Sequence, residues 1–231
     1  MTPTIVYRSS AQSAEVLILG PSGVGKELYA AYIHAESPRA SKPFVVVNCA
    51  NLSVEMIENE IFGHARGAFT GAVTSANGIA AAAEGGTLFL DEIDALPLPC
   101  QAKLLRFAQL REYRRLGEAY MRKSDVRLIT ASNANLQELV RCGEFREDLY
   151  FRLRVVPIEI SPLADRPEDI PPLLDHFTAA YARDYGVEPV SFDSAARERL
   201  MAYHWPGNVR ELENCVRYLS CLGLGRPVRP D

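Results

Sequence analysis

The stretch VLILGPSGVGKE, residues 16–27, decides the fold of this chain. Its four apolar residues are typical of a buried strand, and the glycine-rich turn that follows opens a segment with helical spacing of apolar positions. The spacing G-x-x-x-x-G-K, from Gly20 to Lys26, is that of a phosphate-binding loop. Such a loop works because glycines let the backbone approach a phosphate while successive amides and the helix N-terminus supply positive charge. We therefore expect an α/β fold with a phosphate site at this turn.

Eight consecutive residues of the loop are candidates for nucleotide contact. Lys26 would reach the terminal phosphates as a point charge, whereas Glu27 stands where the pattern has Ser or Thr as a magnesium ligand. Pro21 has no backbone N–H, so one possible phosphate contact is missing. A glycine-rich turn with a surface lysine is the weaker alternative, because a strand precedes the turn and a helix follows it. The candidates are Gly20, Pro21, Ser22, Gly23, Val24, Gly25, Lys26 and Glu27.

Short apolar runs rich in branched residues alternate with helical patterns over the first two thirds of the chain. Apolar runs of this length are typical of parallel strands that are buried on both faces, and strand–helix alternation indicates a three-layer αβα sandwich. The expected strands cover residues 16–20, 44–50, 87–91, 126–132 and 155–160, and the expected helices cover 28–35, 54–61 and 102–110.

The pattern changes after Ser161-Pro162, where prolines punctuate the chain and no further strand candidate appears. A small helical domain is expected there, because three helical stretches follow one another and two of them begin at residues suited to capping. We therefore expect a nucleotide-binding core over residues 1–161 and an all-α lid over 162–231. The three helices are expected at 168–185, at 193–203 from Asp193, and at 208–221 from Asn208.

The segment TLFLDEID, residues 87–94, carries the second half of the expected site. Its apolar residues bring the chain through the sheet and deliver Asp91 and Glu92 at the carboxyl edge, where ligands of open α/β sheets bind. Asp91 would hold Mg²⁺ through water, and Glu92 would orient and deprotonate an attacking water. A solvated strand end is the alternative, and the phosphate loop earlier in the chain favours the nucleotide site.

Composition excludes several other classes of protein. The 231 residues carry a net charge of -4. The basic residues concentrate in the middle of the chain, but the positive charge there is too modest to argue for DNA binding. No apolar run approaches the ~20 residues of a membrane-spanning helix, and the N-terminus lacks a secretory core. Five scattered cysteines without a C-x-x-C pair indicate reduced thiols, not a disulfide framework or a zinc site. A cytoplasmic protein is expected.

The hexapeptide GAFTGA lies at residues 67–72, between the phosphate loop and the segment TLFLDEID. With it, the chain resembles the AAA+ domain of bacterial enhancer-binding proteins, the activators of sigma-54 RNA polymerase, for which this hexapeptide is the hallmark. The resemblance runs from about residue 16 to residue 222. It also rests on SPRASKPFVVVNCANL (37–52), EIFGHAR (60–66), GGTLFLDEID (85–94), FREDLYFRL (145–153) and WPGNVRELEN (205–214), all in family order.

Small residues surround Phe69 and Thr70, so the hexapeptide is too flexible and too poor in apolar side chains for a core element. An ordinary loop with one half-buried Phe is the alternative to a movable contact surface. The resemblance implies that Phe69 and Thr70 touch sigma-54 and that the loop moves with the nucleotide state. The candidate partner-binding residues are Gly67, Ala68, Phe69, Thr70, Gly71 and Ala72.

The resemblance implies further roles. Asn48 would hold the catalytic glutamate inactive until the partner loop engages, although an Asn that caps a turn at a strand end is the alternative from sequence alone. Ser132 and Asn133 match the sensor of the terminal phosphate, and Arg210 matches a second sensor. Residues 114–125 match a second mobile loop near the first.

Arg146 and Arg152 match arginine fingers offered to a neighbouring subunit. The planar guanidinium fork suits this role, because it binds phosphate oxygens without losing its charge. Salt bridges with Glu147 or Asp148 on the same helix are the alternative for either arginine.

The resemblance thus implies an Mg²⁺-dependent ATPase that assembles into a homo-oligomer, expected to be a hexamer, and remodels sigma-54 RNA polymerase holoenzyme to open promoters. DNA contact would come only through domains outside this chain. The short segment before Gly20 and the proline at position 21 motivate an alternative, a nucleotide-binding module that docks on sigma-54 or sister subunits without useful turnover. A remodeller of another substrate is a third possibility, against which the intact GAFTGA counts.

Overall fold

The computed structural model describes residues 14–51, 56–222 and 228. These residues form two compact units, each described by itself below. The first unit comprises the described residues up to Leu19 together with Lys26–Glu159, and the second comprises Gly20–Gly25 and the chain from Ile160 onward. The six loop residues 20–25, which sequence patterns assign to the nucleotide-binding core, therefore group with the helical C-terminal part.

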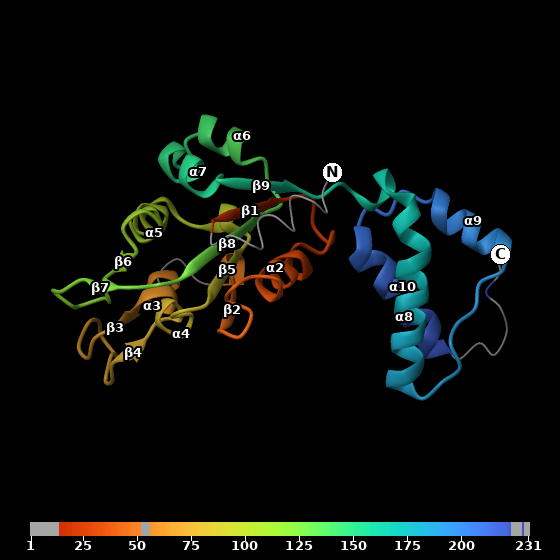
Figure 1. Ribbon diagram of the computed structural model, residues 1–231, viewed down its shortest axis with the longest axis horizontal. Coiled ribbons are helices and arrows are strands. Elements are labelled where there is room, and N and C mark those ends of the chain that lie inside the picture. The colour runs from red at the N-terminus through yellow and green to blue at the C-terminus, as the bar shows by residue number, and fades with distance from the viewer. Residues whose placement is uncertain (1–13, 52–55, 223–227, 229–231) are drawn as a thin grey trace. The chain divides into compact units, whose positions relative to one another are not determined.

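A five-stranded parallel sheet forms the centre of the first unit (Figure 1). All four pairings along the sheet are parallel, as the apolar runs predict, and the fold-class prediction is confirmed. The register places Asn48 beside Asp91 at the carboxyl ends of neighbouring strands. In sheet order, the strands are β2 (Phe44–Asn48), β5 (Thr87–Asp91), β8 (Arg127–Ser132), β1 (Val16–Leu19) and β9 (Val156–Glu159).

Helices lie on both sides of this sheet and complete the three layers (Figure 1). Two of them begin earlier than expected: one at Lys26, directly after the last loop glycine, and one at Leu98, where a proline in the first turn costs no hydrogen bond. The helices are α2 (Lys26–Ala35), α3 (Ile57–Phe62), α4 (Ile79–Ala82), α5 (Leu98–Leu110), α6 (Leu136–Arg141) and α7 (Glu147–Leu153). The first two positions of the expected helix 54–61 lie outside the described residues.

Two short antiparallel hairpins extend the first unit beyond the sheet, and sequence patterns do not predict either one. One pairs β3 (Gly63–His64) with β4 (Ala76–Asn77), and the other pairs β6 (Glu112–Tyr113) with β7 (Arg122–Lys123). Strands of two residues are too short to display a two-residue period, so only the turn composition between them marks the loops.

The second unit is helical, as expected for a lid. Asp193 caps its second helix, because the carboxylate accepts a hydrogen bond from the backbone N–H of Ala196 at 2.7 Å. Trp205 is buried in the core of this unit and donates its indole N–H to the carbonyl of Leu200 at 2.8 Å. The elements are the 3₁₀ turns Leu163–Asp165 and Pro167–Asp169 and the helices α8 (Ile170–Tyr185), α9 (Ser194–Ala202) and α10 (Asn208–Leu222). Within the described residues, no helix has both the length and the apolar character that crossing a membrane requires.

We predict that Phe107→Ala lowers the free energy of unfolding by about 3–5 kcal/mol. Phe107 is fully buried in α5, and its ring packs edge-on against Phe62 and Tyr113 at centroid distances of 5.9 and 6.1 Å. Urea denaturation followed by circular dichroism measures the change. Leu110→Ala is the matched control on the same helix, because that side chain is 56% exposed and its loss should cost little. Equal losses for the two variants would contradict the packing described here.

Candidate functional site

The phosphate-loop residues of the second unit form a tight turn that requires glycine. Gly23 has a φ of 79°, and a Cβ atom there would lie 2.3 Å from the carbonyl oxygen of Gly207. Gly25, with a φ of 96°, is the residue before Lys26, which begins α2 and is buried. The glycines predicted to shape a phosphate loop therefore occupy backbone conformations that other residues rarely adopt.

Arg210 contacts this loop in two ways. Its backbone N–H donates to the carbonyl of Gly23 at 3.2 Å, and its guanidinium donates to the hydroxyl of Ser22 at 3.1 Å. The side chain is exposed, and it lies on the first turn of α10. A cation at this place is within reach of a group bound at the loop, which is what the expected sensor role needs.

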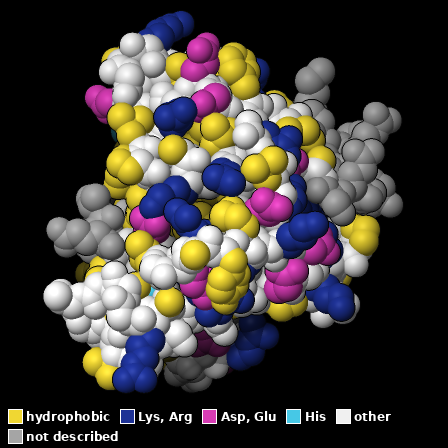
Figure 2. Space-filling view, turned by 90° about the vertical axis from the view of Figure 1, so that its left-hand side faces the viewer, with side chains coloured by type: hydrophobic (Ala, Val, Ile, Leu, Met, Phe, Trp, Pro, Cys, Tyr) yellow, Lys and Arg dark blue, Asp and Glu magenta, His cyan; other side chains and the backbone are white. Residues whose placement is uncertain are grey.

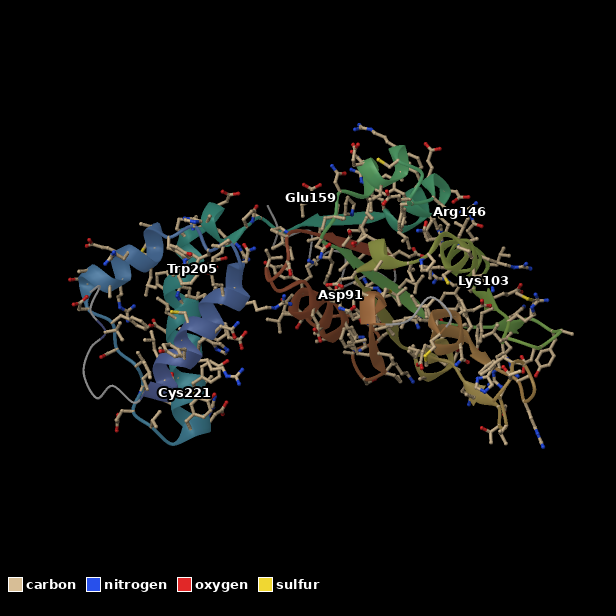
Figure 3. The ribbon with its side chains drawn as sticks, turned by 180° about the vertical axis from the view of Figure 1, so that it is seen from behind. Asp91, Lys103, Arg146, Glu159, Trp205 and Cys221 are labelled. Atoms are coloured by element: carbon tan, nitrogen blue, oxygen red, sulfur yellow. The ribbon has the colours of Figure 1, made fainter. Side chains whose placement is uncertain are left out.

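In the first unit, Asp91 ends β5 at the carboxyl edge of the sheet (Figure 3), and Glu92 is the next residue along the chain. The Asp91 carboxylate accepts the backbone N–H of Glu92 at 3.0 Å. Glu92 adopts a left-handed conformation, with φ 53° and ψ 49°, which is uncommon for a residue with a side chain. A half-buried carboxylate held in this strained turn is characteristic of residues whose position matters for chemistry.

Three carboxylates gather around the buried thiol of Cys49. Burial, together with the negative charges of Asp91, Asp94 and Glu92, raises the pKa of this thiol to about 12. The local field therefore favours cations. Among the described residues, no group of three or more His, Cys, Asp or Glu side chains has the arrangement of a metal cage. A single strand-end carboxylate such as Asp91 fits Mg²⁺, which keeps several waters and takes its other ligands from phosphates.

Two strand-end residues, Asn48 and Ser132, make hydrogen bonds at the carboxyl edge of the sheet. The Asn48 side-chain oxygen accepts the backbone N–H of Ala50 at 2.9 Å, which is the turn-capping contact considered as the alternative to a switch role. The buried hydroxyl of Ser132 donates to Asp94 at 2.6 Å, while Asn133 is exposed at the end of β8. Sequence reasoning did not single out Asp94, because its partner lies 38 residues away.

The two candidate arginine fingers have different surroundings. Arg146 is exposed at the start of α7 (Figure 3), and its guanidinium forms a forked pair with Asp148 at 3.0 and 2.7 Å. That pair lowers the pKa of Asp148 through the hydrogen bond from Arg146. An exposed pair of this kind contributes little stability, so exchanging it for a phosphate costs little.

Arg152, by contrast, is tied to the body of the first unit. It donates twice to the carbonyl of Ala108, at 3.2 and 2.8 Å, and once to Glu15 at 3.0 Å. Glu15 is buried and also pairs with Arg111, so this carboxylate joins two guanidiniums. Sequence reasoning did not find Glu15, since nothing in the sequence marks a contact over 137 positions.

The hexapeptide 67–72 lies between β3 and β4 as a closed turn. The N–H of Gly67 donates to the carbonyl of Ala72 at 2.9 Å, and the N–H of Ala72 donates to the carbonyl of Phe69 at 3.0 Å. The Phe69 side chain is 48% exposed, and Thr70 is exposed beside it. A Cβ atom at Gly67 or at Gly71 would meet no atom within 4 Å, so these glycines serve the positive-φ turn and not close packing.

His64 supports this loop from its base. Its Nε2 donates to the carbonyl of Thr74 at 2.9 Å, and its ring lies edge-on to Phe69 at a centroid distance of 5.0 Å. The second hairpin lies directly beside the first, because the Ala65 N–H donates to the Leu116 carbonyl at 2.9 Å. The exposed aromatic ring is therefore carried on a hydrogen-bonded base formed by both hairpins.

Comparison with known protein families gives two matches that together cover most of the chain. Residues 3–159 match the sigma-54 interaction domain, and residues 164–231 match the AAA+ ATPase lid domain. Solved structures agree with this. The structure of NtrX from Brucella abortus has a TM-score of 0.91 at 39% identity and covers 99% of this chain and 52% of that chain. Its complexes with ADP and with ATP have TM-scores of 0.89 and 0.88.

Curated relatives are regulators of transcription. The chain is 49% identical over 213 residues to the alginate biosynthesis regulator AlgB of Pseudomonas aeruginosa, covering 92% of this chain and 47% of AlgB. It is 51% identical over 221 residues to NtrC of Bradyrhizobium, covering 94% of this chain and 46% of NtrC. The chain spans about half the length of these relatives. On these matches and on the fold, the chain belongs to the sigma-54 interaction domain family of AAA+ proteins.

Proposed function

We propose that this chain is an ATP-hydrolysing activator domain that remodels sigma-54 RNA polymerase holoenzyme so that a promoter can open. The observation that carries the proposal is the exposed Phe69–Thr70 turn, raised on a hairpin of an AAA+ core. The regulators it resembles include proteins named as sigma-54-dependent, and NtrX has been crystallised with both ADP and ATP. A cytoplasmic location follows from this role.

In the proposed chemistry, the chain's own residues bind and orient ATP. The amides of the loop 20–25 and Lys26 hold the phosphates, Asn133 and Arg210 read the terminal phosphate, and Glu92 takes the proton from the attacking water. Asp91 would hold Mg²⁺ through water, and the bound ion would supply positive charge to the phosphates. Asn48 restrains Glu92 in this proposal, and the Ala50 N–H is the competing partner that it would have to release.

The partner surface is proposed to contact protein and not nucleic acid. Figure 2 views the molecule from the side of the two hairpins. Among the described side chains on this face, Lys and Arg are interspersed with Asp, Glu and hydrophobic residues, unlike the single-sign patch typical of nucleic-acid-binding surfaces. Sigma-54 is therefore the proposed partner of residues 67–72, and DNA contact is assigned to other domains of the full regulator.

Catalysis is proposed to require a ring, expected to be a hexamer, in which Arg146 and Arg152 act on the neighbour's ATP. The exposure of Arg146 supports this role for it, whereas Arg152 would first have to leave Glu15 and Ala108. If turnover per protomer rises steeply with protein concentration, assembly is confirmed as a condition of activity. A rate that stays at background while nucleotide binds would favour the alternative, a binding module without useful turnover.

Glu92→Gln should retain ATP binding and reduce turnover by about 10²–10⁴-fold. The amide keeps the size and the strained backbone position of the carboxylate but cannot accept a proton. Fluorescence titration with a labelled ATP measures binding, and phosphate release measures turnover. Glu188→Gln, at an exposed carboxylate between α8 and α9 and distant in sequence from the motif, is the control. Wild-type turnover in Glu92→Gln would refute the proposed role.

Thr70→Ala should reduce transcription activation about thirtyfold or more, as expected for loss of a hot-spot contact, while ATP hydrolysis stays unchanged. Ser75→Ala removes the same hydroxyl group from an exposed position of the same hairpin loop and should leave both activities intact. Open-complex formation with sigma-54 holoenzyme and phosphate release are measured on the same samples. Wild-type activation by Thr70→Ala would refute the proposed contact of Thr70.

Mixing two inactive variants tests whether Arg146 acts between subunits. Arg146→Ala protomers keep an intact Glu92, and Glu92→Gln protomers keep an intact finger, so mixed rings contain complete sites. A finger supplies about 10³–10⁵ in rate in related systems, so the mixture should regain a measurable part of wild-type ATPase while each variant alone does not. If the mixture were no more active than its components, Arg146 would not act in trans.

A further inference from the structure

Three successive carbonyl groups of the phosphate loop accept hydrogen bonds from the helical part of the second unit. Asn208 Nδ2 donates to the carbonyl of Ser22 at 2.9 Å. The backbone N–H of Arg210 donates to the carbonyl of Gly23 at 3.2 Å, and Arg166 Nη2 donates to the carbonyl of Val24 at 3.2 Å. Two of these three donors are side chains, so two of the hydrogen bonds to the loop depend on the identity of residues 166 and 208.

The burial and the backbone conformation of Asn208 suit it to this contact. It is 97% buried, with a relative exposure of 3%, and it adopts a left-handed conformation with φ 54° at the start of α10. Its side-chain oxygen accepts the N–H of Leu163 at 2.9 Å while its Nδ2 donates to Ser22. One buried amide therefore joins the beginning of the helical segment to the phosphate loop, and both of its ends have partners.

Arg166 makes the matching contact from the 3₁₀ turns. Its side chain is only 16% exposed and donates through Nη1 to Asp169 at 3.0 Å and through Nη2 to Val24. The ion pair with Asp169 fixes the plane of the guanidinium, and the fork then directs a second nitrogen to the loop. A flexible lysine would supply one point charge and could not make both contacts in fixed geometry.

The direction of the carbonyls sets the direction of the amides. No described peptide bond is cis, and in a trans peptide unit the N–H points opposite to the C=O. The N–H groups of Gly23, Val24 and Gly25 therefore point away from the donors that hold the preceding carbonyls. Successive N–H groups presented in this way form an anion-binding nest.

We propose that Asn208 and Arg166 are positioning residues, which hold the loop 22–24 by its carbonyls so that its amides face a nucleotide phosphate. This inference rests on the proposed function, because it assumes that the loop binds a nucleotide. It assigns to the helical unit a second task besides the expected sensing by Arg210: the lid orders the phosphate site even when no terminal phosphate is present. ADP binding should then depend on both residues.

Asn208→Asp and Arg166→Ala test the proposal in the full chain. Asn208→Asp keeps the acceptor for Leu163 but replaces the Nδ2 donor with an oxygen. Each variant should bind fluorescent ADP about tenfold more weakly, roughly the contribution of one hydrogen bond. Arg166→Lys should fall between Arg166→Ala and the wild type. Asn214→Ala and Arg183→Ala, at exposed positions of α10 and α8, are the matched controls and should bind as the wild type does.

Hydrogen exchange of the nucleotide-free protein supplies a readout that a general loss of stability would not reproduce. The amides of residues 22–25 should exchange faster in Asn208→Asp and Arg166→Ala, while the strands β5 and β8 keep wild-type protection. Should Asn208→Asp unfold the helical unit, Arg166→Ala and Arg166→Lys still decide the question.

The outcomes separate the two ideas. Unchanged loop exchange together with unchanged ADP affinity in both variants would overturn the positioning role. A different result would be faster loop exchange in the variants together with a wild-type protein that does not bind ADP. That result would support the hydrogen bonds to the loop carbonyls as positioning contacts and would overturn the proposed nucleotide function instead. Equal loosening of the loop and of the sheet strands would show a structural role only and would also overturn the proposal.

Discussion

Parallel pairing of the strands is the constraint on which the rest of the first unit depends. Because β2, β5 and β8 run in the same direction, their last residues meet at one edge, where Asn48, Asp91 and Ser132 end their strands. Antiparallel pairing of any neighbour would send one of these side chains to the opposite edge. The apolar side chains that bury the sheet between helices thus also assemble its polar edge, and packing and chemistry cannot be altered independently here.

The sequence predicts those parts of the molecule that a repeating pattern encodes. The five strands are predicted because each contains a short apolar run rich in branched residues. The helices of the second unit are predicted because their apolar residues recur at helical spacing and Asp193 marks a start. The hairpins that carry the exposed loops are not predicted, because two-residue strands contain no period. Contacts between distant residues, such as that of Asn208 with Ser22 over 186 positions, leave no local trace in a single sequence.

The partners of charged side chains are likewise not predicted by the sequence, as Arg146 and Arg152 at α7 show. The family resemblance implies that both arginines are fingers, and the alternative of a pair with a nearby carboxylate describes Arg146 with Asp148. Arg152 instead finds its partners in Glu15 and the Ala108 carbonyl. Since a guanidinium bound to a buried carboxylate loses much if it is released, the two arginines differ in how readily they can exchange partners, although their motif presents them alike.

The grouping of residues 20–25 with the helical unit also bears on how the protein can be divided. A C-terminal piece that begins at residue 160 would fold, if at all, without six residues from the other end of the chain. The Asn208 amide and the Arg166 guanidinium would then lack the carbonyls that satisfy them, and a buried donor without an acceptor is destabilising. The match to the lid family covers one continuous segment, residues 164–231, whereas the compact unit also includes residues 20–25. A gene cut at the apparent domain boundary would therefore lack six residues of that unit.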